Sequence, residues 1–156
     1  MSQWTHVAAV IRVDDLFGTR EDLIKVIGKP WKPYGNSYGD YYDYYDYPTV
    51  STEKQCKLPC GSEGSLDVII SQNPNSHCLA KWVVTIFGDL RDYGSSDEIR
   101  KWFIRLIRRL RKRYSIRQAV CTADVEYGQA TSLLYDGNSS GFDVHEKIIY
   151  GKERRD

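Results

Sequence analysis

The residues best suited to chemistry lie in a short polar loop that precedes an apolar run. Residues 58–66 read LPCGSEGSL, so that Ser62, Glu63 and Ser65 alternate with glycines. Glycine lets backbone N–H groups converge, and hydroxyl groups add further hydrogen-bond donors. This composition is typical of a loop that holds a polar or anionic ligand, in which Glu63 could accept hydrogen bonds from a base edge or a ribose hydroxyl. The alternative is a structural turn in which Glu63 caps local backbone.

A second polar segment follows the clearest predicted strand. Residues 87–93 read FGDLRDY. The planar guanidinium of Arg91 could bind phosphate or carboxylate, with Asp92 beside it and Tyr93 stacking on the ligand. The alternative is that Arg91 is held in ion pairs by its neighbouring aspartates. The sequence leaves both interpretations open.

Strand pairing predicts that these two segments are neighbours. The runs 66–72 and 79–88 predict a hairpin, which puts residues 66 and 88 at the same end. The polar loop should therefore lie beside residues 88–93. Two residues on the mixed face of the first predicted strand, His6 and Arg12, could complete the site. The predicted ligand-binding set is Ser62, Glu63, Ser65, Arg91, Asp92, Tyr93, His6 and Arg12.

The sequence lacks the motifs of a catalytic or metal centre. It contains no Walker loop, no H-E-x-x-H and no G-x-S-x-G. Cys56 and Cys60 are four positions apart and His77 is adjacent to Cys78, a spacing that suits a tetrahedral zinc site poorly. We therefore expect a binding protein rather than an enzyme, with no cofactor and no metal.

The charge of the chain is balanced overall but uneven locally. The 156 residues carry a net charge of +1, and the length predicts a single domain over residues 1–156. Residues 100–113 hold eight lysines and arginines on a predicted amphipathic helix. This basic helix could contact the phosphates of nucleic acid, although a solvated helix face is the more frequent explanation of such a pattern.

A tyrosine- and aspartate-rich insertion spans about residues 34–57. Seven of the 12 tyrosines lie between Tyr34 and Tyr47, interleaved with aspartates. Packing of these rings on the protein's own surface is one explanation, and an aromatic platform that stacks on a ligand is another. Because tyrosine is enriched in protein interfaces, the insertion could also bind a partner protein.

The order of predicted elements indicates an α+β fold. The order β-α-β-β-α-β is the ferredoxin-like arrangement, an antiparallel sheet with two helices on one face, here with extra C-terminal strands. An open sheet edge favours a homodimer or higher homo-oligomer. The sequence shows no membrane span and no signal peptide, so we expect a cytoplasmic protein. The first predicted helix follows Thr19, and the second spans about residues 96–114. The predicted strands are residues 4–13, 66–72, 79–88, 116–127, 131–135 and 142–150.

Three segments together resemble a group of small, largely uncharacterised bacteriophage proteins. These are W-T-H-V at 4–7 with I-R at 11–12, L-P-C-G-S-E-G-S-L at 58–66, and F-G-D-L-R-D-Y at 87–93, and the similarity extends in order from residue 4 to about residue 125. Compact phage proteins without catalytic motifs often resemble inhibitors of host defence, and some of those bind cyclic or ADP-ribose-type nucleotide signals.

The resemblance implies a non-enzymatic anti-defence protein that sequesters a small, anionic, nucleotide-like ligand in the host cytoplasm. Two alternatives remain. One is a nucleic-acid-binding accessory protein that uses the helix at 100–113. The other is an inhibitor that binds a host defence protein through the tyrosine- and aspartate-rich insertion.

Overall fold

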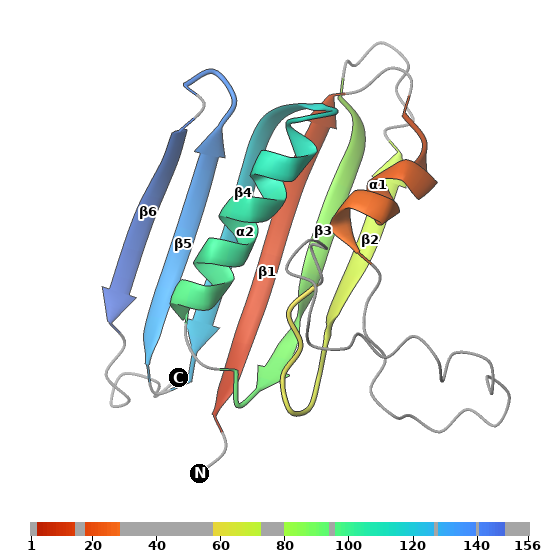
Figure 1. Ribbon diagram of the computed structural model, residues 1–156. Coiled ribbons are helices and arrows are strands. Elements are labelled where there is room, and N and C mark those ends of the chain that lie inside the picture. Colours follow the sequence, from red (N-terminus) through yellow and green to blue (C-terminus); the bar gives the residue numbers. More distant parts are fainter. Residues whose placement is uncertain are drawn as a thin grey trace, which may run out of the picture.

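The described part of the chain forms one six-stranded antiparallel sheet with two helices (Figure 1). The computed structural model describes residues 3–14, 18–28, 58–72, 80–93, 96–126, 128–139 and 141–148. The strands are ordered β2-β3-β1-β4-β5-β6 across the sheet. The elements are β1 (Trp4–Asp14), α1 (Arg20–Ile27), β2 (Leu66–Gln72), β3 (Ala80–Arg91), α2 (Ser96–Leu110), β4 (Ser115–Val125), β5 (Gln129–Asp136) and β6 (Gly141–Ile148). The prediction of an α+β fold with an antiparallel sheet and two helices is confirmed.

Strand β1 lies at the centre of the sheet, between β3 and β4. Its side chains alternate as the sequence predicts, because successive residues of a strand point to opposite faces. Val7, Ala9, Ile11 and Val13 are buried, whereas the residues between them are partly or fully exposed. One face of the sheet is therefore the core face, and the other is open.

The two helices supply the other half of the core. In α1, the Thr19 hydroxyl accepts a hydrogen bond from the Asp22 backbone N–H at 3.2 Å, which is the predicted N-cap. In α2, one stripe that includes Phe103, Leu106 and Leu110 is fully buried, as its spacing predicts. Figure 1 shows both helices in front of the sheet, and α2 contacts β4, β5 and α1. Neither helix is long and apolar enough to span a membrane.

Several element ends differ from the sequence prediction. Strand β3 continues past Gly88 to Arg91, because β1 pairs with it as far as Trp4. Helix α2 ends at Leu110, and residues 111–113 form a turn. The tyrosine- and aspartate-rich insertion at 34–57 and the predicted turn at 73–76 lie outside the described residues.

Candidate functional site

The polar loop packs directly against the end of β3. Leu66 pairs with Gly88, as the predicted hairpin requires. Two backbone hydrogen bonds continue this pairing: the Ser62 N–H donates to the Arg91 carbonyl, and the Arg91 N–H donates to the Glu63 carbonyl, both at 2.9 Å. Ser65 lies at the base of the loop, in a β-bridge with Cys60. The predicted neighbourhood of residues 61–65 and 88–93 is confirmed.

The glycines of this loop allow two backbones to approach each other closely. Gly64 has a φ of +81°, and a Cβ atom at this position would lie 2.0 Å from the Asp89 carbonyl oxygen. A Cβ atom on Gly61 would lie 2.4 Å from the Arg91 carbonyl oxygen. Both glycines are therefore required by the contact with β3, whether or not a ligand binds.

Arg91 is held by carboxylates of its own chain. Its Nη1 atom lies 2.5 Å from Glu63 Oε1, and its Nε atom lies 3.8 Å from Asp92 Oδ2. The hydrogen bond and the negative charge of Glu63 raise the pKa of Arg91 above its usual range. The side chains of Arg91 and Glu63 are 34% and 60% exposed, so this ion pair lies at the surface.

Asp92 is fixed by the loop and by the chain before β1. Its carboxylate accepts a hydrogen bond from the Ser62 hydroxyl at 2.9 Å, and its backbone N–H donates to the Gln3 carbonyl at 2.7 Å. The hydrogen bond from Ser62, followed by one from the Gln3 backbone, holds the pKa of Asp92 below its ordinary value. Asp92 has a φ of +53°, a left-handed conformation that aspartate tolerates better than most residues. No sequence pattern pointed to the contact with Gln3.

Tyr93 directly follows Asp92 and packs on the core. Its ring packs against the buried hydrophobic cluster, and burial raises the pKa of its hydroxyl. Its backbone carbonyl accepts a hydrogen bond from the Thr5 hydroxyl at 3.2 Å. A ring packed in this way offers less surface for ligand stacking than the sequence predicted.

His6 extends the cluster across the open face of the sheet. Its Nδ1 atom lies 2.7 Å from Asp89 Oδ1, and its Nε2 atom lies 3.8 Å from Glu126 Oε1. Glu126 Oε2 also accepts a hydrogen bond from the Trp4 backbone N–H at 3.2 Å. Sequence reasoning missed Glu126, because only the pairing of β1 with β4 reveals its place beside His6.

Arg12 lies apart from the other predicted ligand-binding residues. It is six residues from His6 along β1, which separates the two by about 20 Å at a strand rise of about 3.4 Å per residue. Asp14 bridges Arg12 and Arg117 at that end. Arg12 Nε lies 3.4 Å from Asp14 Oδ1, and Arg117 Nε lies 3.4 Å from Asp14 Oδ2. The structure therefore brings seven of the eight predicted residues to one end of the sheet and leaves Arg12 at the other.

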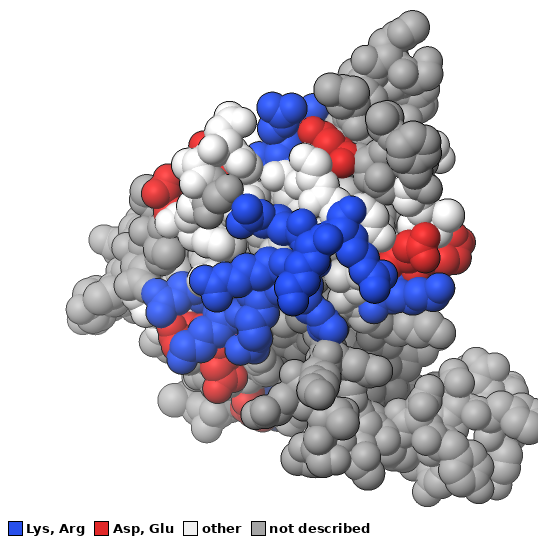
Figure 2. Space-filling view, turned by 45° about the horizontal axis from the view of Figure 1, so that its top comes forward, with Lys and Arg blue, Asp and Glu red and all other residues white. Residues whose placement is uncertain are grey.

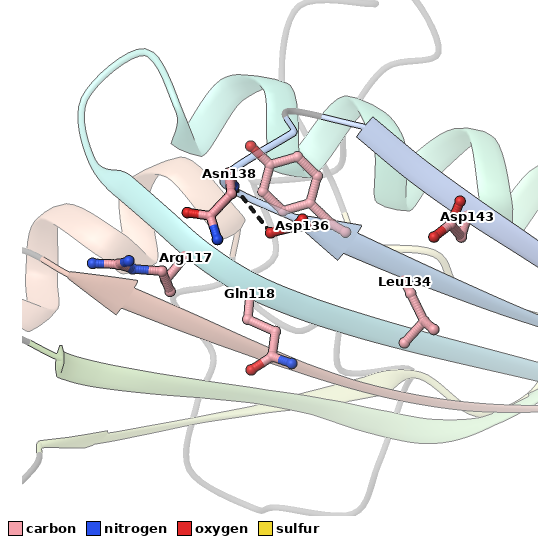
Figure 3. Close-up of a pocket in the computed structure, with 7 residues that line it drawn as sticks. Arg117, Gln118, Leu134, Asp136, Asn138 and Asp143 are labelled. Carbon is pink, nitrogen blue, oxygen red and sulfur yellow. Dashed lines mark hydrogen bonds between the residues drawn. The ribbon is translucent and has the colours of Figure 1, made fainter.

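A shallow pocket lies near the Arg12 end of the sheet, between β4 and β5 (Figure 3). It has a volume of about 390 Å³ and contains none of the predicted ligand-binding residues. Its one cation, Arg117, already faces Asp14, and two of its lining residues are aspartates. This charge balance does not favour an anionic ligand. The lining residues are Arg117, Gln118, Leu134, Tyr135, Asp136, Asn138 and Asp143.

The strongest concentration of positive charge lies on α2 and the turn that follows it. Figure 2 shows lysine and arginine side chains gathered in one broad patch on the helix side of the molecule. Arg100 and Lys101 both pair with Asp97. By contrast, Arg105, Arg108, Lys112 and Arg113 form no ion pair with any carboxylate that the structure describes. The exposed residues that we call the basic surface are Lys101, Arg105, Arg108, Arg111, Lys112 and Arg113.

The cysteines give no support to a metal site within the described residues. Cys60 is exposed, whereas Cys121 is buried on β4. Burial raises the pKa of the Cys121 thiol to about 12, so it stays protonated at neutral pH. Across the described ranges, no three histidine, cysteine, aspartate or glutamate side chains are grouped so that they could hold a metal ion. Cys56, His77 and Cys78 lie outside those ranges.

The cluster around Arg91 and the basic surface differ in whether their charges have partners within the chain. The cluster around Arg91 pairs its charges internally, and the basic surface presents several of its charges to solvent. Comparison with models of protein families, with curated proteins and with solved structures finds no match for this chain.

Proposed function

We propose that the chain is a non-enzymatic binding protein that holds the phosphate backbone of a nucleic acid on its basic surface. The observation that carries this proposal is that four exposed cations form no ion pair with any carboxylate among the described residues: Arg105, Arg108, Lys112 and Arg113. Cations that are not already paired can contact phosphates and release the counterions condensed on them. The basic surface therefore supports this function better than the internally paired cluster around Arg91.

The spacing of the cations suits an extended polyanion. Arg105 and Arg108 are three residues apart, so they lie along one side of α2. Lys101, which pairs with Asp97, lies one turn before Arg105 on the same side. A helix of 15 residues is about 22 Å long, which spans several phosphates of a nucleic-acid strand. The described part of this surface exposes no large aromatic side chain, so we expect contacts to the backbone rather than stacking on bases.

Charge reversal on α2 tests the proposal. We expect a fluorescently labelled duplex of arbitrary sequence to bind the full chain at low salt, as measured by anisotropy. Arg108→Glu should weaken binding several-fold, because it removes one phosphate contact and adds a repelling charge. Lys25→Glu is the matched control, because Lys25 lies on α1 and already faces Asp22.

Either of two results would contradict the proposal. One is the absence of binding to duplex or single-stranded nucleic acid at low salt. The other is an equal loss of affinity in Arg108→Glu and Lys25→Glu, which would indicate a response to net charge alone.

We also propose that the fold is ferredoxin-like. The strand order β2-β3-β1-β4, with α1 between β1 and β2 in the chain and α2 between β3 and β4, supports this classification. Strands β5 and β6 then form an extension beside β4. The fold does not decide the function, because folds of this kind serve many unrelated activities.

A second candidate function is the binding of a small, nucleotide-like anion at Arg91. The exposure of the Arg91–Glu63 pair supports it, because surface ion pairs contribute little to stability and a phosphate group can compete with Glu63. Ser62 and Glu63 would then present their side chains to the ligand. Host-defence signals of the cyclic dinucleotide or ADP-ribose type have the appropriate charge.

Neutralising Glu63 tests this second candidate. Glu63→Gln removes the carboxylate that competes for Arg91, so a phosphate-bearing ligand should bind this variant more tightly than the unmodified chain. Calorimetry with cyclic dinucleotides, cyclic trinucleotides and ADP-ribose measures the difference, and Arg91→Ala should abolish the binding. Absence of binding to both the unmodified chain and Glu63→Gln would contradict the candidate.

The remaining expectations about origin and partner stay predictions. These are the resemblance to phage proteins, an anti-defence role in the host cytoplasm, and binding of a host defence protein through the insertion at 34–57. That insertion lies outside the described residues. Deletion of residues 38–47 followed by a pull-down from host lysate would test the last of them.

A further inference from the structure

The open face of the sheet exposes large apolar side chains from four strands. Val10, Ile69, Phe87 and Leu134 are 42%, 49%, 40% and 43% exposed. Each points away from the helices, because neighbouring residues in its strand are buried or pack on the core. Exposed apolar side chains gathered on one face indicate an interaction surface.

The strand register aligns three of these side chains in one row. Ile69 pairs with Thr85, Thr85 with Val10, Val10 with Val120, and Val120 with Leu134. The row therefore runs across the strands from β2 to β5. Four strand spacings of about 4.8 Å give it a length of about 19 Å. We call Ile69, Val10 and Leu134 the apolar row.

Exposed carboxylates border the apolar row on both sides. Asp67 lies two residues before Ile69 on β2, and Asp136 lies two residues after Leu134 on β5, so both share the face of the row. Asp143 on β6 pairs with Leu134 and extends the same line. All three aspartates are exposed, and none forms an ion pair with a cation that the structure describes. The row is thus an apolar strip with negative charge along its borders.

The arginines of this face do not balance those carboxylates. Arg12 and Arg117 share Asp14, which lies within 3.4 Å of both. A further exposed carboxylate, Asp89, faces His6. On the described part of the face, exposed carboxylates therefore outnumber guanidinium groups. A partner that covers this face should carry positive charge beside apolar side chains.

The pocket between β4 and β5 opens beside one end of the apolar row (Figure 3). Leu134, Asp136 and Asp143 are among the residues that line its volume of about 390 Å³. A lysine or arginine side chain suits this lining, because its alkyl stem can lie along Leu134 while its charge approaches the two carboxylates. The pocket can therefore receive one basic side chain of the partner.

We propose that the open face binds a basic amphipathic helix of another protein, with the apolar stripe of that helix on the apolar row. A helix of this kind presents an apolar stripe with charged side chains on both sides, which matches the pattern across the face. At a rise of 1.5 Å per residue, about 13 residues cover the row. Lysine or arginine side chains on the borders of the stripe then meet the aspartates.

The same features disfavour the other occupants of such a face. The carboxylates repel the phosphates of nucleic acid and of anionic lipids. A second copy of the chain could offer the cations of α2, but the apolar stripe of that helix is already buried against its own sheet. Such a copy would leave the apolar row uncovered. The basic surface lies on the helix side of the sheet and stays accessible when the open face is occupied.

Binding of a model peptide to the full chain tests the proposal. The probe is a fluorescently labelled, helix-forming peptide of about 14 residues, with a leucine stripe bordered by lysines. We expect it to bind the unmodified chain, as measured by anisotropy at physiological salt. A matched peptide with glutamate in place of every lysine should not bind.

Two double variants separate the charged from the apolar contribution. Asp136→Asn with Asp143→Asn should weaken binding of the lysine peptide several-fold. Its control is Glu21→Gln with Glu98→Gln, which removes the same charge from exposed positions on the two helices and should leave the affinity unchanged.

Val10→Thr with Ile69→Thr removes apolar contacts without a change of charge, and should also weaken binding several-fold. Threonine suits an exposed strand position, and circular dichroism with urea unfolding verifies that every variant is folded.

Several results would overturn the proposal. These are no binding of the lysine peptide, equal binding of the glutamate peptide, an unchanged affinity in Val10→Thr with Ile69→Thr, and an equal loss of affinity in the aspartate and glutamate pairs. Sedimentation velocity adds one more: an unmodified chain that dimerises, with a dimer that dissociates in Val10→Thr with Ile69→Thr, would assign the face to a second copy.

Discussion

At the scale of single residues, the polar side chains that the sequence suggested for ligand binding bind one another instead. Arg91, Glu63, Ser62 and Asp92 come together as predicted, and they form ion pairs and hydrogen bonds with one another. The sequence showed which residue types were present in this region, and the hairpin argument placed them side by side. It could not show whether Arg91 faces its own carboxylates or a ligand, because that depends on rotamers that only the folded loop defines.

Removing the Ser62 hydroxyl should change the titration of Asp92. The hydrogen bond from Ser62 is the largest cause of the lowered pKa of Asp92, so Ser62→Ala should move that pKa back toward its ordinary value of 3.8. A carboxyl with a lowered pKa stabilises the fold above pH 3.8, and this contribution is lost as the pH falls through the folded-state pKa. The free energy of unfolding of Ser62→Ala should therefore depend less steeply on pH in this acidic window.

NMR titration of the Asp92 carboxyl carbon measures the pKa directly, and urea unfolding across the acidic range measures the stability. Ser71→Ala is the control, because Ser71 is exposed on β2 and lies outside the loop. An Asp92 pKa that is the same in Ser62→Ala and in the unmodified chain would show that the hydroxyl does not hold this carboxylate.

At the scale of elements, the docking of the polar loop on β3 is the feature that the sequence predicted least completely. Alternation in β1 and the Thr19 cap of α1 were predictable, because both depend on local patterns. The extension of β3 to Arg91 was not, because Gly88 suggested a strand end and only the pairing with β1 carries the strand further. Glu126 was missed for the same reason, since its position depends on a partner far away in sequence.

The same docking predicts that Gly64 tolerates no side chain. Gly64→Ala should lower the free energy of unfolding by more than about 1 kcal/mol, because it places a Cβ atom against the Asp89 carbonyl in a left-handed conformation. Gly141→Ala is the control, because the nearest atom to a Cβ there is Ser139 Oγ at an ordinary 3.4 Å. Urea denaturation compares the two variants, and equal stability would show that the loop does not pack on β3 as described.

At the scale of the whole molecule, the two sides of the sheet differ in the side chains that they expose. The helices cover one side, and α2 with its following turn carries the basic surface, as Figures 1 and 2 show. The other side exposes apolar side chains of β1, β2, β3 and β5. The net charge of +1 conceals the basic surface, because carboxylates elsewhere in the chain balance its cations.

The salt dependence of nucleic-acid affinity tests the central claim most directly. We predict that the logarithm of the association constant for a labelled duplex falls linearly with the logarithm of salt concentration. Replacing Arg105 and Arg108 together by glutamine should reduce that slope by about two, since each lost phosphate contact reduces it by about one. An affinity that does not change with salt, or a slope that is the same in the double variant, would contradict the assignment of the basic surface as the binding site.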